Sequence, residues 1–328
     1  MRLRLVAPLA VCVALALASP AAASLTTFQS MTGNLGVSTD GCGSLAQTCT
    51  LTANVPAGAT VVAAYLYTAT FTLSSVPTNV AGLGGTFGGN AVSYTALGLS
   101  SPQANFFLQA GRSDVTATAA AAIDGGPGGT YNFTVTETDA NQDGEGLVVV
   151  YSLGSLPVST VGILDGFSAT TGDSASINFS SPLDPTQSGF FADMFVGDSF
   201  SCCSQTSRIT VNGTVITENA GNADDGSVAN GALITVGGWD DPVSPFLPSY
   251  ADDHERYSLI PQIPNGSTSI LIQTLNPSND DNIFLEVFHV LGEGTVSTGP
   301  QAPEPATLTL VGLGCLGAAR KLRRRLAA

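Results

Sequence analysis

Lysine is absent from residues 24–302, and this stretch contains only three arginines, Arg112, Arg208 and Arg256. The same stretch contains 24 of the chain's 25 acidic residues, because only Glu304 lies outside it, so its formal charge is −21. DNA and RNA binding depends on lysine and arginine at the phosphates, and anionic lipids attract the same side chains. The scarcity of cations therefore excludes nucleic acid as a partner and disfavours an anionic membrane surface.

An apolar run of the roughly 20 residues that an ordinary spanning helix needs is also missing. Residues 1–23 begin with two arginines, continue with an apolar segment at 5–18 and end in three alanines. This order is typical of a cleaved signal peptide. We therefore expect residues 1–23 to direct export through the secretory translocon, and the mature chain to begin near Ser24.

The C-terminal end combines three elements in a fixed order. A tripeptide whose two prolines disfavour helix comes first, followed by 14 apolar residues at 306–319 and then by a basic cluster. The tripeptide is Pro303, Glu304 and Pro305, and the cluster is Arg320, Lys321, Arg323, Arg324 and Arg325. Basic clusters stay on the cytoplasmic side of a membrane. We expect the apolar residues to form a short transmembrane helix that leaves the tripeptide outside.

This pattern resembles the PEP-CTERM sorting signal, by which exosortase-type enzymes recognise exported proteins of Gram-negative bacteria. The resemblance covers residues 303–325. It implies that an exosortase-type enzyme processes the chain, that the protein lies transiently in the inner membrane, and that it then reaches the cell surface or extracellular matrix.

Helical periodicity is scarce, whereas threonine, serine, valine and glycine are prominent and several segments alternate between apolar and polar residues. The expected strands are residues 60–71, 130–138, 146–152, 174–179, 207–217, 232–236, 267–275 and 282–291. Expected turns fall at 124–128, 143–144, 212–213 and 265–266. One short helix is expected at 114–122. This pattern predicts an all-β fold, a β-sandwich or jelly roll.

The sequence divides into segments with different composition. A Gly-Ser-Leu-Pro sequence after the strongest strand predicts a boundary near residue 156, and therefore two packed β-sandwich domains at 24–155 and 156–293. Residues 294–302 are rich in Gly, Ser, Thr and Pro and predict a flexible tether before the sorting signal at 303–328. The order of three short strand motifs also loosely resembles an uncharacterised family of secreted bacterial β-domains: Ala64-Tyr65-Leu66-Tyr67, Asp114-Val115-Thr116 and Val148-Val149-Val150-Tyr151.

Four of the six cysteines lie in the expected mature chain: Cys42, Cys49, Cys202 and Cys203. An even number in an exported protein predicts disulfides. Two arrangements stay open at this point. Either two bridges join the N-terminal loop to the middle of the chain, or a local bridge coexists with a vicinal pair. Zinc is disfavoured, because the chain has two histidines and no C-x-x-C sequence.

The sharpest chemical motif lies at residues 139–145. Asp139, Asn141 and Asp143 present oxygen ligands at alternate positions, followed by Gly144 and by Glu145 as a further ligand, which is the pattern of a calcium loop. The EF-hand's last ligand is missing, since position 12 is a valine. The alternative is a solvated hairpin turn, which the same residue types favour. Calcium is therefore a candidate cofactor.

Two further residues, Trp239 and Ser199, bear on the class of function. Trp239, the single tryptophan, is a candidate sugar platform, although a lone tryptophan in a sandwich is more often packing. Ser199 lies in an esterase-like Gly-Asp-Ser sequence, but no histidine follows an aspartate at the required spacing, and we assign no catalytic residue. The sequence predicts a non-enzymatic surface or matrix protein, with extracellular polysaccharide as a candidate partner. The alternatives are a calcium-dependent glycan-binding adhesion module and a secreted hydrolase.

Overall fold

The computed structural model describes residues 24–43, 46–73, 78–99, 107–199, 206–218, 223–224, 227–228, 234–248, 255–278 and 282–299. Residues 23–299 form one compact unit. Every strand pairing in the described part of this unit is antiparallel, and the strands build four sheets of four to six strands and one small two-stranded sheet. The all-β sandwich prediction is confirmed.

Two sheets are built from residues 35–152. Sheet C has the order β3 (Thr48–Val55), β9 (Gly129–Glu137), β5 (Gly84–Phe87) and β6 (Asn90–Ser93). Sheet B has the order β2 (Leu35–Cys42), β10 (Gln142–Ser152), β4 (Thr60–Thr72), β8 (Phe107–Asp114) and β7 (Thr95–Leu99). The 3-10 helix η1 (Val80–Gly82) and the helix α2 (Thr116–Ile123) accompany them, and α2 packs on β4.

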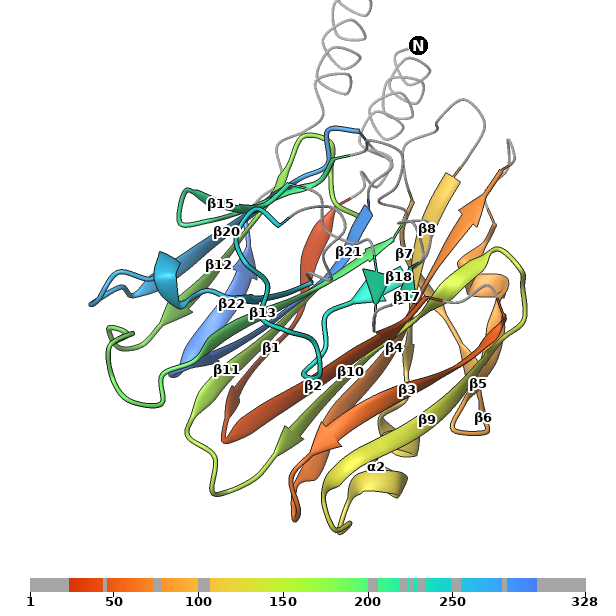
Figure 1. Cartoon of the computed structure of the whole chain (residues 1–328), viewed down its shortest axis with the longest axis horizontal. Helices are drawn as coiled ribbons and strands as arrows, with labels where there is room; N and C mark the ends of the chain where they lie inside the picture. The colour runs from red at the N-terminus through yellow and green to blue at the C-terminus, as the bar shows by residue number, and fades with distance from the viewer. Residues whose placement is uncertain are drawn as a thin grey trace, which may run out of the picture. The chain divides into compact units, whose positions relative to one another are not determined.

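The other two sheets are built from residues 159–298, with one exception. Sheet A has the order β1 (Leu25–Gly33), β11 (Ser159–Gly166), β21 (Asn282–Leu291), β13 (Ala192–Ser199) and β18 (Ile234–Val236), and β19 (Arg256–Ser258) also pairs with β13. Sheet D has the order β15 (Thr214–Thr217), β14 (Arg208–Val211), β20 (Ser269–Leu275), β12 (Asp173–Phe179) and β22 (Gly294–Thr298). The short strands β16 (Ala223–Asp224) and β17 (Ser227–Val228) pair with each other, and η2 (Ile260–Gln262) follows β19. The exception is β1, which lies beside β11 (Figure 1).

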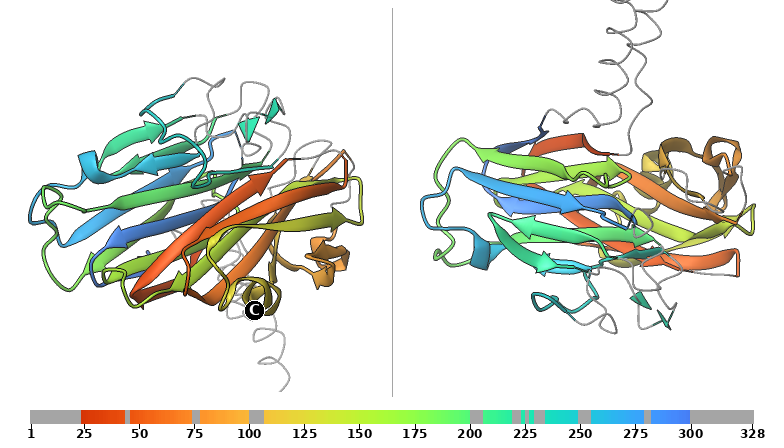
Figure 2. Two further views of the ribbon diagram at one scale, coloured as in Figure 1. Left: turned by 60° about the horizontal axis from the view of Figure 1, so that its bottom comes forward. Right: turned by 90° about the horizontal axis from the view of Figure 1, so that it is seen from above.

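Three apolar layers hold the sheets together in the order C, B, A, D (Figure 2). The layer between sheets C and B contains Leu66 and Val149, the layer between B and A contains Tyr67 and Val148, and the layer between A and D contains Phe288. Neighbouring residues of β4 and β10 thus enter opposite layers, as the period of two in a strand requires. Sheets A and B are therefore covered on both faces, which explains why the central strands are apolar on both sides.

The predicted domain boundary near residue 156 falls on the connection between β10 and β11. The sheets on its two sides are not separate, because β1 pairs with β11 across the boundary and one apolar layer joins sheets B and A. The observed arrangement is two stacked sandwiches that share a core and exchange one strand, within a single compact unit.

The tether prediction is wrong for its first five residues. Gly294–Thr298 form β22, which pairs with β12. Val296 is 3% exposed and enters the layer between sheets A and D, whereas Thr295 and Ser297 on either side are exposed. One inward apolar residue was enough, because the edge of β12 offers unpaired backbone groups to a following strand.

The predicted helix and most of the predicted turns are observed. The alanine-rich segment after Asp114 forms α2, and the Asp114 carboxylate accepts a 2.9 Å hydrogen bond from the Thr116 N–H. Asn212 and Gly213 have φ angles of 47° and 83° and connect β14 to β15, as expected of an Asn-Gly hairpin. The turn predicted at Asp143-Gly144 is wrong, because both residues lie inside β10.

Candidate functional site

The sorting tripeptide, the apolar segment and the basic cluster lie outside the described residues, as do the signal peptide and residues 300–302 of the predicted tether. Among the residues that the structure does describe, no helix is long and apolar enough to cross a membrane. The candidate sites that the structure can place are the 139–145 segment, the Cys42 and Cys49 pair, and Trp239.

The 139–145 segment does not form an exposed loop of ligands. Asp139 Oδ1 accepts hydrogen bonds from the backbone N–H and from the side-chain amide of Asn141, at 2.9 and 2.6 Å. From Gln142 onward the chain is strand β10, which is irregular opposite β4 between Gln142 and Glu145. Gly144 has a φ of +117°, and a Cβ there would lie 2.1 Å from the Cys42 carbonyl oxygen. This glycine therefore serves a bulge in a strand rather than the turn of a calcium loop.

Asp143 and Glu145 are instead buried, at 8% and 1% exposure. Glu137 on β9 lies near them and is 9% exposed, and the Tyr94 hydroxyl donates to Glu145 Oε1 at 3.3 Å. Burial and the neighbouring Glu137 raise the pKa of Asp143 to about 8. Burial also raises the pKa of both Glu137 and Glu145, which interact with each other. At neutral pH this cluster therefore holds protonated carboxyl groups.

A metal centre is not assembled from these side chains. In the described ranges, no group of three or more His, Cys, Asp or Glu residues has an arrangement that could hold a metal ion. The two pairs of predicted ligands behave differently, because Asp139 and Asn141 bond to each other while Asp143 and Glu145 enter a strand. Calcium binding stays a prediction without geometric support, and the solvated-turn alternative is wrong for Asp143 and Glu145.

Sequence reasoning missed Glu137 and Tyr94, although a signal for the first was present. The expected strand at 130–138 places Phe133 and Val135 on its inward face, and Glu137 continues the same alternation. Tyr94 follows the short strand β6 (Asn90–Ser93), which is too short to show a clear alternation of apolar and polar residues.

Cys42 and Cys49 form a disulfide. Of the two arrangements left open by the sequence, the structure therefore excludes the pair of bridges that would join the N-terminal loop to the middle of the chain. The bridge links the end of β2 to the start of β3, and both sulfur-bearing residues pack against the layer between sheets C and B. Cys202 and Cys203 lie outside the described residues.

We expect the double variant Cys42→Ala/Cys49→Ala to lose about 2–3 kcal/mol of unfolding free energy, because the bridge closes a short loop and so restricts the unfolded chain. Chemical denaturation measures this loss, and reduction of the unaltered protein should reproduce it. Thr50→Ala, at an exposed neighbouring position on β3, is the control for altering this strand. Equal stability of the double variant and the unaltered protein would contradict the expectation.

Trp239 follows β18 and is half-buried against the layer between sheets B and A. Its indole N–H donates to the Val37 carbonyl oxygen, and its ring centroid lies 5.3 Å from that of Phe195. The guanidinium carbon of Arg256 lies 4.4 Å from the tryptophan ring, and Arg256 also donates to the Trp239 carbonyl oxygen at 3.2 Å. A sugar would have to share this ring with Arg256, so these contacts favour the packing alternative, and the platform stays a prediction.

The esterase-like serine has no described histidine near it. Ser199 ends β13 and is 1% exposed, and His289 on the adjacent β21 is in register with Asp193 instead. Six residues along a strand separate the two positions by roughly 20 Å. Burial lowers the pKa of His289 to about 4, and its Nε2 atom lies 3.2 Å from the Leu35 carbonyl oxygen. These two side chains cannot form a nucleophile–base pair.

A further buried carboxyl lies in the centre of sheet A. Glu286 on β21 is fully buried, and neither of its carboxyl oxygens has a hydrogen-bond partner among the described residues. Alternation along β21 places it on the same face as Phe288, toward sheet D. Burial, with Asp173 nearby, raises its pKa to about 8.

Comparison with known proteins bears on the end of the chain. A family model described as the PEP-CTERM protein-sorting motif matches residues 301–325. The match includes the Pro303-Glu304-Pro305 tripeptide, the apolar segment and the basic cluster, and it confirms the resemblance seen in the sequence. No curated protein and no solved structure matches the chain.

Proposed function

We propose that this chain, which carries a PEP-CTERM sorting motif and is an exported protein that an exosortase sorts, is a non-enzymatic component of the cell surface or the extracellular polysaccharide matrix. The observation that carries the proposal is the motif match at residues 301–325. The motif directs export and a cell-surface or extracellular location, and the −21 charge of residues 24–302 suits a protein that stays hydrated outside the cell.

The tail would act in three steps. The secretory translocon exports the chain until the apolar residues at 306–319 enter the inner membrane. The basic cluster at 320–325 then keeps the end of the chain cytoplasmic, which presents Pro303-Glu304-Pro305 at the outer face. The exosortase recognises this tripeptide, and processing releases the β body from its transient membrane anchor.

The β body supports a structural role more than a hydrolytic one. A glycosidase needs one carboxyl group to donate a proton and a second to act as base or nucleophile beside an accessible substrate. The carboxyl groups with strongly raised pKa values, Asp143, Glu145 and Glu286, are each 8% exposed or less. Side chains so enclosed stabilise or destabilise the fold but do not reach an external sugar.

Glu304→Ala is expected to leave unprocessed precursor in the inner membrane of the native host, because the tripeptide loses its only charge. Intact mass and cell fractionation measure this outcome. The unaltered protein should be found outside the cell, beginning near Ser24 and ending near the tripeptide. Deletion of residues 320–325 should also leave precursor behind.

Glu293→Ala is the matched control, since it removes an exposed acidic residue shortly before the motif without touching it. We expect this variant to be processed normally. Normal processing and surface delivery of Glu304→Ala would contradict the proposed sorting mechanism. An unaltered protein that keeps its basic tail in the inner membrane would contradict the proposed matrix role.

A further inference from the structure

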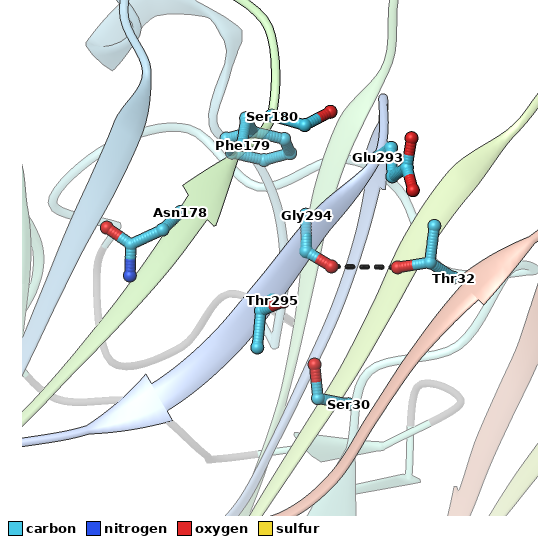
Figure 3. Close-up of a pocket in the computed structure, with 8 residues that line it drawn as sticks. All are labelled: Ser30, Thr32, Asn178, Phe179, Ser180, Glu293, Gly294 and Thr295. Atoms are coloured by element: carbon cyan, nitrogen blue, oxygen red, sulfur yellow. Dashed lines mark hydrogen bonds between the residues drawn. The ribbon is translucent and has the colours of Figure 1, made fainter.

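A groove of about 600 Å³ crosses the place where sheets A and D meet at their edges (Figure 3). The edge strands β1 and β22 are not joined there by a backbone ladder. Side-chain hydroxyl groups join them instead. Thr32 Oγ1 donates to the Gly294 carbonyl oxygen at 2.7 Å, and Ser30 Oγ accepts from the Val296 N–H at 2.8 Å. The lining residues come from β1, from residues 293–295 at the start of β22, and from residues 178–180 at the end of β12, so the groove extends across β22.

The groove is lined almost entirely by polar, uncharged groups. Its eight lining residues are Ser30, Thr32, Asn178, Phe179, Ser180, Glu293, Gly294 and Thr295. They comprise four hydroxyl side chains, one amide, one carboxylate, one aromatic ring and one glycine, without an arginine, lysine or histidine. All six polar side chains are exposed, whereas Phe179 is 8% exposed and belongs to the core beneath.

Two of these side chains are held in fixed relation by the sheet. Asn178 on β12 and Thr295 on β22 are directly opposite each other in the strand register, so they stand on the same face of sheet D. Glu293 and Ser180 lie at one end of the same strand pair, where the Ser180 N–H donates to the Glu293 carbonyl oxygen at 2.9 Å. A Cβ on Gly294 would lie 2.9 Å from the Asn178 carbonyl oxygen, so a bare glycine is required between them.

We propose that this groove binds an uncharged oligosaccharide. Amide and hydroxyl groups can both donate to and accept from sugar hydroxyl groups, and a carboxylate accepts from them. The volume lies within the range of small-molecule sites. The carboxylate of Glu293 and the absence of a cation in the lining disfavour phosphorylated or carboxylated sugars. The lack of exposed apolar surface disfavours a lipid or an apolar peptide. This inference deepens the proposed matrix role, since it assigns a ligand class to the β body.

The test is a titration calorimetry series with the processed protein purified from its host. The probes are three neutral hexasaccharides, namely cellohexaose, maltohexaose and laminarihexaose, and one anionic control, hexagalacturonate. At least one neutral probe should bind with a dissociation constant on the order of 0.1–1 mM, as expected for a shallow polar site. Asn178→Ala and Glu293→Gln should each weaken that binding about five-fold, the usual effect of one lost hydrogen bond.

Asn132→Ala is the matched control, because Asn132 is likewise an exposed strand asparagine but lies on β9 of sheet C. It should bind like the unaltered protein. Thr295→Ala provides a further groove variant if either of the others fails to fold. Three results would overturn the proposal. The first is that no neutral probe binds at a probe concentration about 10-fold above the highest expected dissociation constant. The others are that the groove variants bind as tightly as the unaltered protein, or that hexagalacturonate binds more tightly than the neutral probes. None of these results alters the mass measurement that tests sorting, so the two proposals fail separately.

Discussion

Raising the pH from 6.5 to 8 is expected to lower the free energy of unfolding of this protein by about 3 kcal/mol through two buried carboxyl groups. The cause is a set of carboxyl groups that fold into the interior without a cation beside them. Asp143 and Glu286 each have a pKa raised to about 8, chiefly by burial. The three arginines of residues 24–302 contact other groups, namely Asp165, Glu218 and the Trp239 region.

The direction follows from proton binding in the two states. Between the ordinary carboxyl pKa near 4 and a folded pKa near 8, the folded protein keeps each proton while the unfolded chain has lost it. Unfolding therefore releases protons, and stability falls by about 1.4 kcal/mol per pH unit for each such group. The stabilising contribution of the protonated form is complete at low pH and is lost as the pH rises through 8. The Glu137 and Glu145 pair acts in the same direction.

His289 has the opposite pH dependence, which lies mostly below this window. Burial lowers its pKa to about 4, so it favours the folded state above the unfolded pKa near 6.5, and that contribution is lost as the pH falls toward 4. Between pH 6.5 and 8 the imidazole is neutral in the folded protein and at most half protonated in the unfolded chain, so it offsets the fall in stability by only about 0.4 kcal/mol. The fall in stability between pH 6.5 and 8 therefore reports the carboxyl groups.

Chemical denaturation at several pH values measures how steeply the free energy of unfolding falls with pH. Glu286→Gln should reduce this slope by the contribution of one carboxyl group. The amide cannot ionise, so the variant should be more stable than the unaltered protein at pH 8. Asp184→Asn is the control for loss of a negative charge. Asp184 is fully exposed, and the Thr186 side chain lowers its pKa, so it is ionised in both states throughout the window. A pH-independent stability between 6.5 and 8 would contradict the buried-carboxyl account.

Asp165→Ala is expected to lower the free energy of unfolding by about 3–5 kcal/mol. Asp165 on β11 forms an ion pair with Arg112 on β8, and the two side chains are 5% and 17% exposed. Its Oδ2 atom also accepts a 3.1 Å hydrogen bond from the buried hydroxyl of Tyr67. The guanidinium carbon of Arg112 lies 3.3 Å from the ring centroid of Phe28 on β1. Removal of the carboxylate would leave a largely buried positive charge without its partner.

This network joins the two sandwiches, because β8 belongs to sheet B and β11 and β1 belong to sheet A. Arg112→Ala should cost less than Asp165→Ala at low pH, since the remaining carboxyl group can take up a proton, whereas an arginine cannot lose one. The double variant Arg112→Met/Asp165→Leu should lie within about 1–2 kcal/mol of the unaltered protein, because neither charge is then buried alone.

Glu218→Ala provides the matched control, as it breaks the 2.6 Å pair with Arg208, in which both side chains are 48% exposed. Exposed pairs contribute about 0–1 kcal/mol. Thermal or chemical unfolding of the four variants distinguishes the two classes of ion pair. If Asp165→Ala and Glu218→Ala were equally stable, the buried pair would not hold the sandwiches together.

Local sequence patterns were enough to predict part of the strands, the sorting tail and one hairpin. All eight expected segments contain observed strands, because alternating β-branched and aromatic residues fit a pleated surface with two faces. The segment at 207–217 forms the two strands β14 and β15, and other strands, including β11 and β13, were not predicted. The Asn212-Gly213 turn was equally local, since it depends on two residues that tolerate positive φ. The sorting tail could be recognised from the sequence because its motif is linear: a tripeptide, an apolar run and a basic cluster follow one another along the chain. The family match at residues 301–325 confirms it.

The pairing of the strands and the burial of particular polar residues follow from the tertiary structure. The pairing of β1 with β11 joins residues more than 100 positions apart, and nothing in either strand specifies its partner. The local sequence likewise does not specify that Asp143 and Glu145 are buried. Next to Gly144 they have the composition of a solvated loop. The ladders of β10 with β2 and β4 nevertheless run from Glu145 onward, after an irregularity that contains Asp143 and Gly144, and both carboxyl groups are buried. Burial depends on what packs against a side chain from elsewhere in the chain, and that is fixed only when the sheets stack.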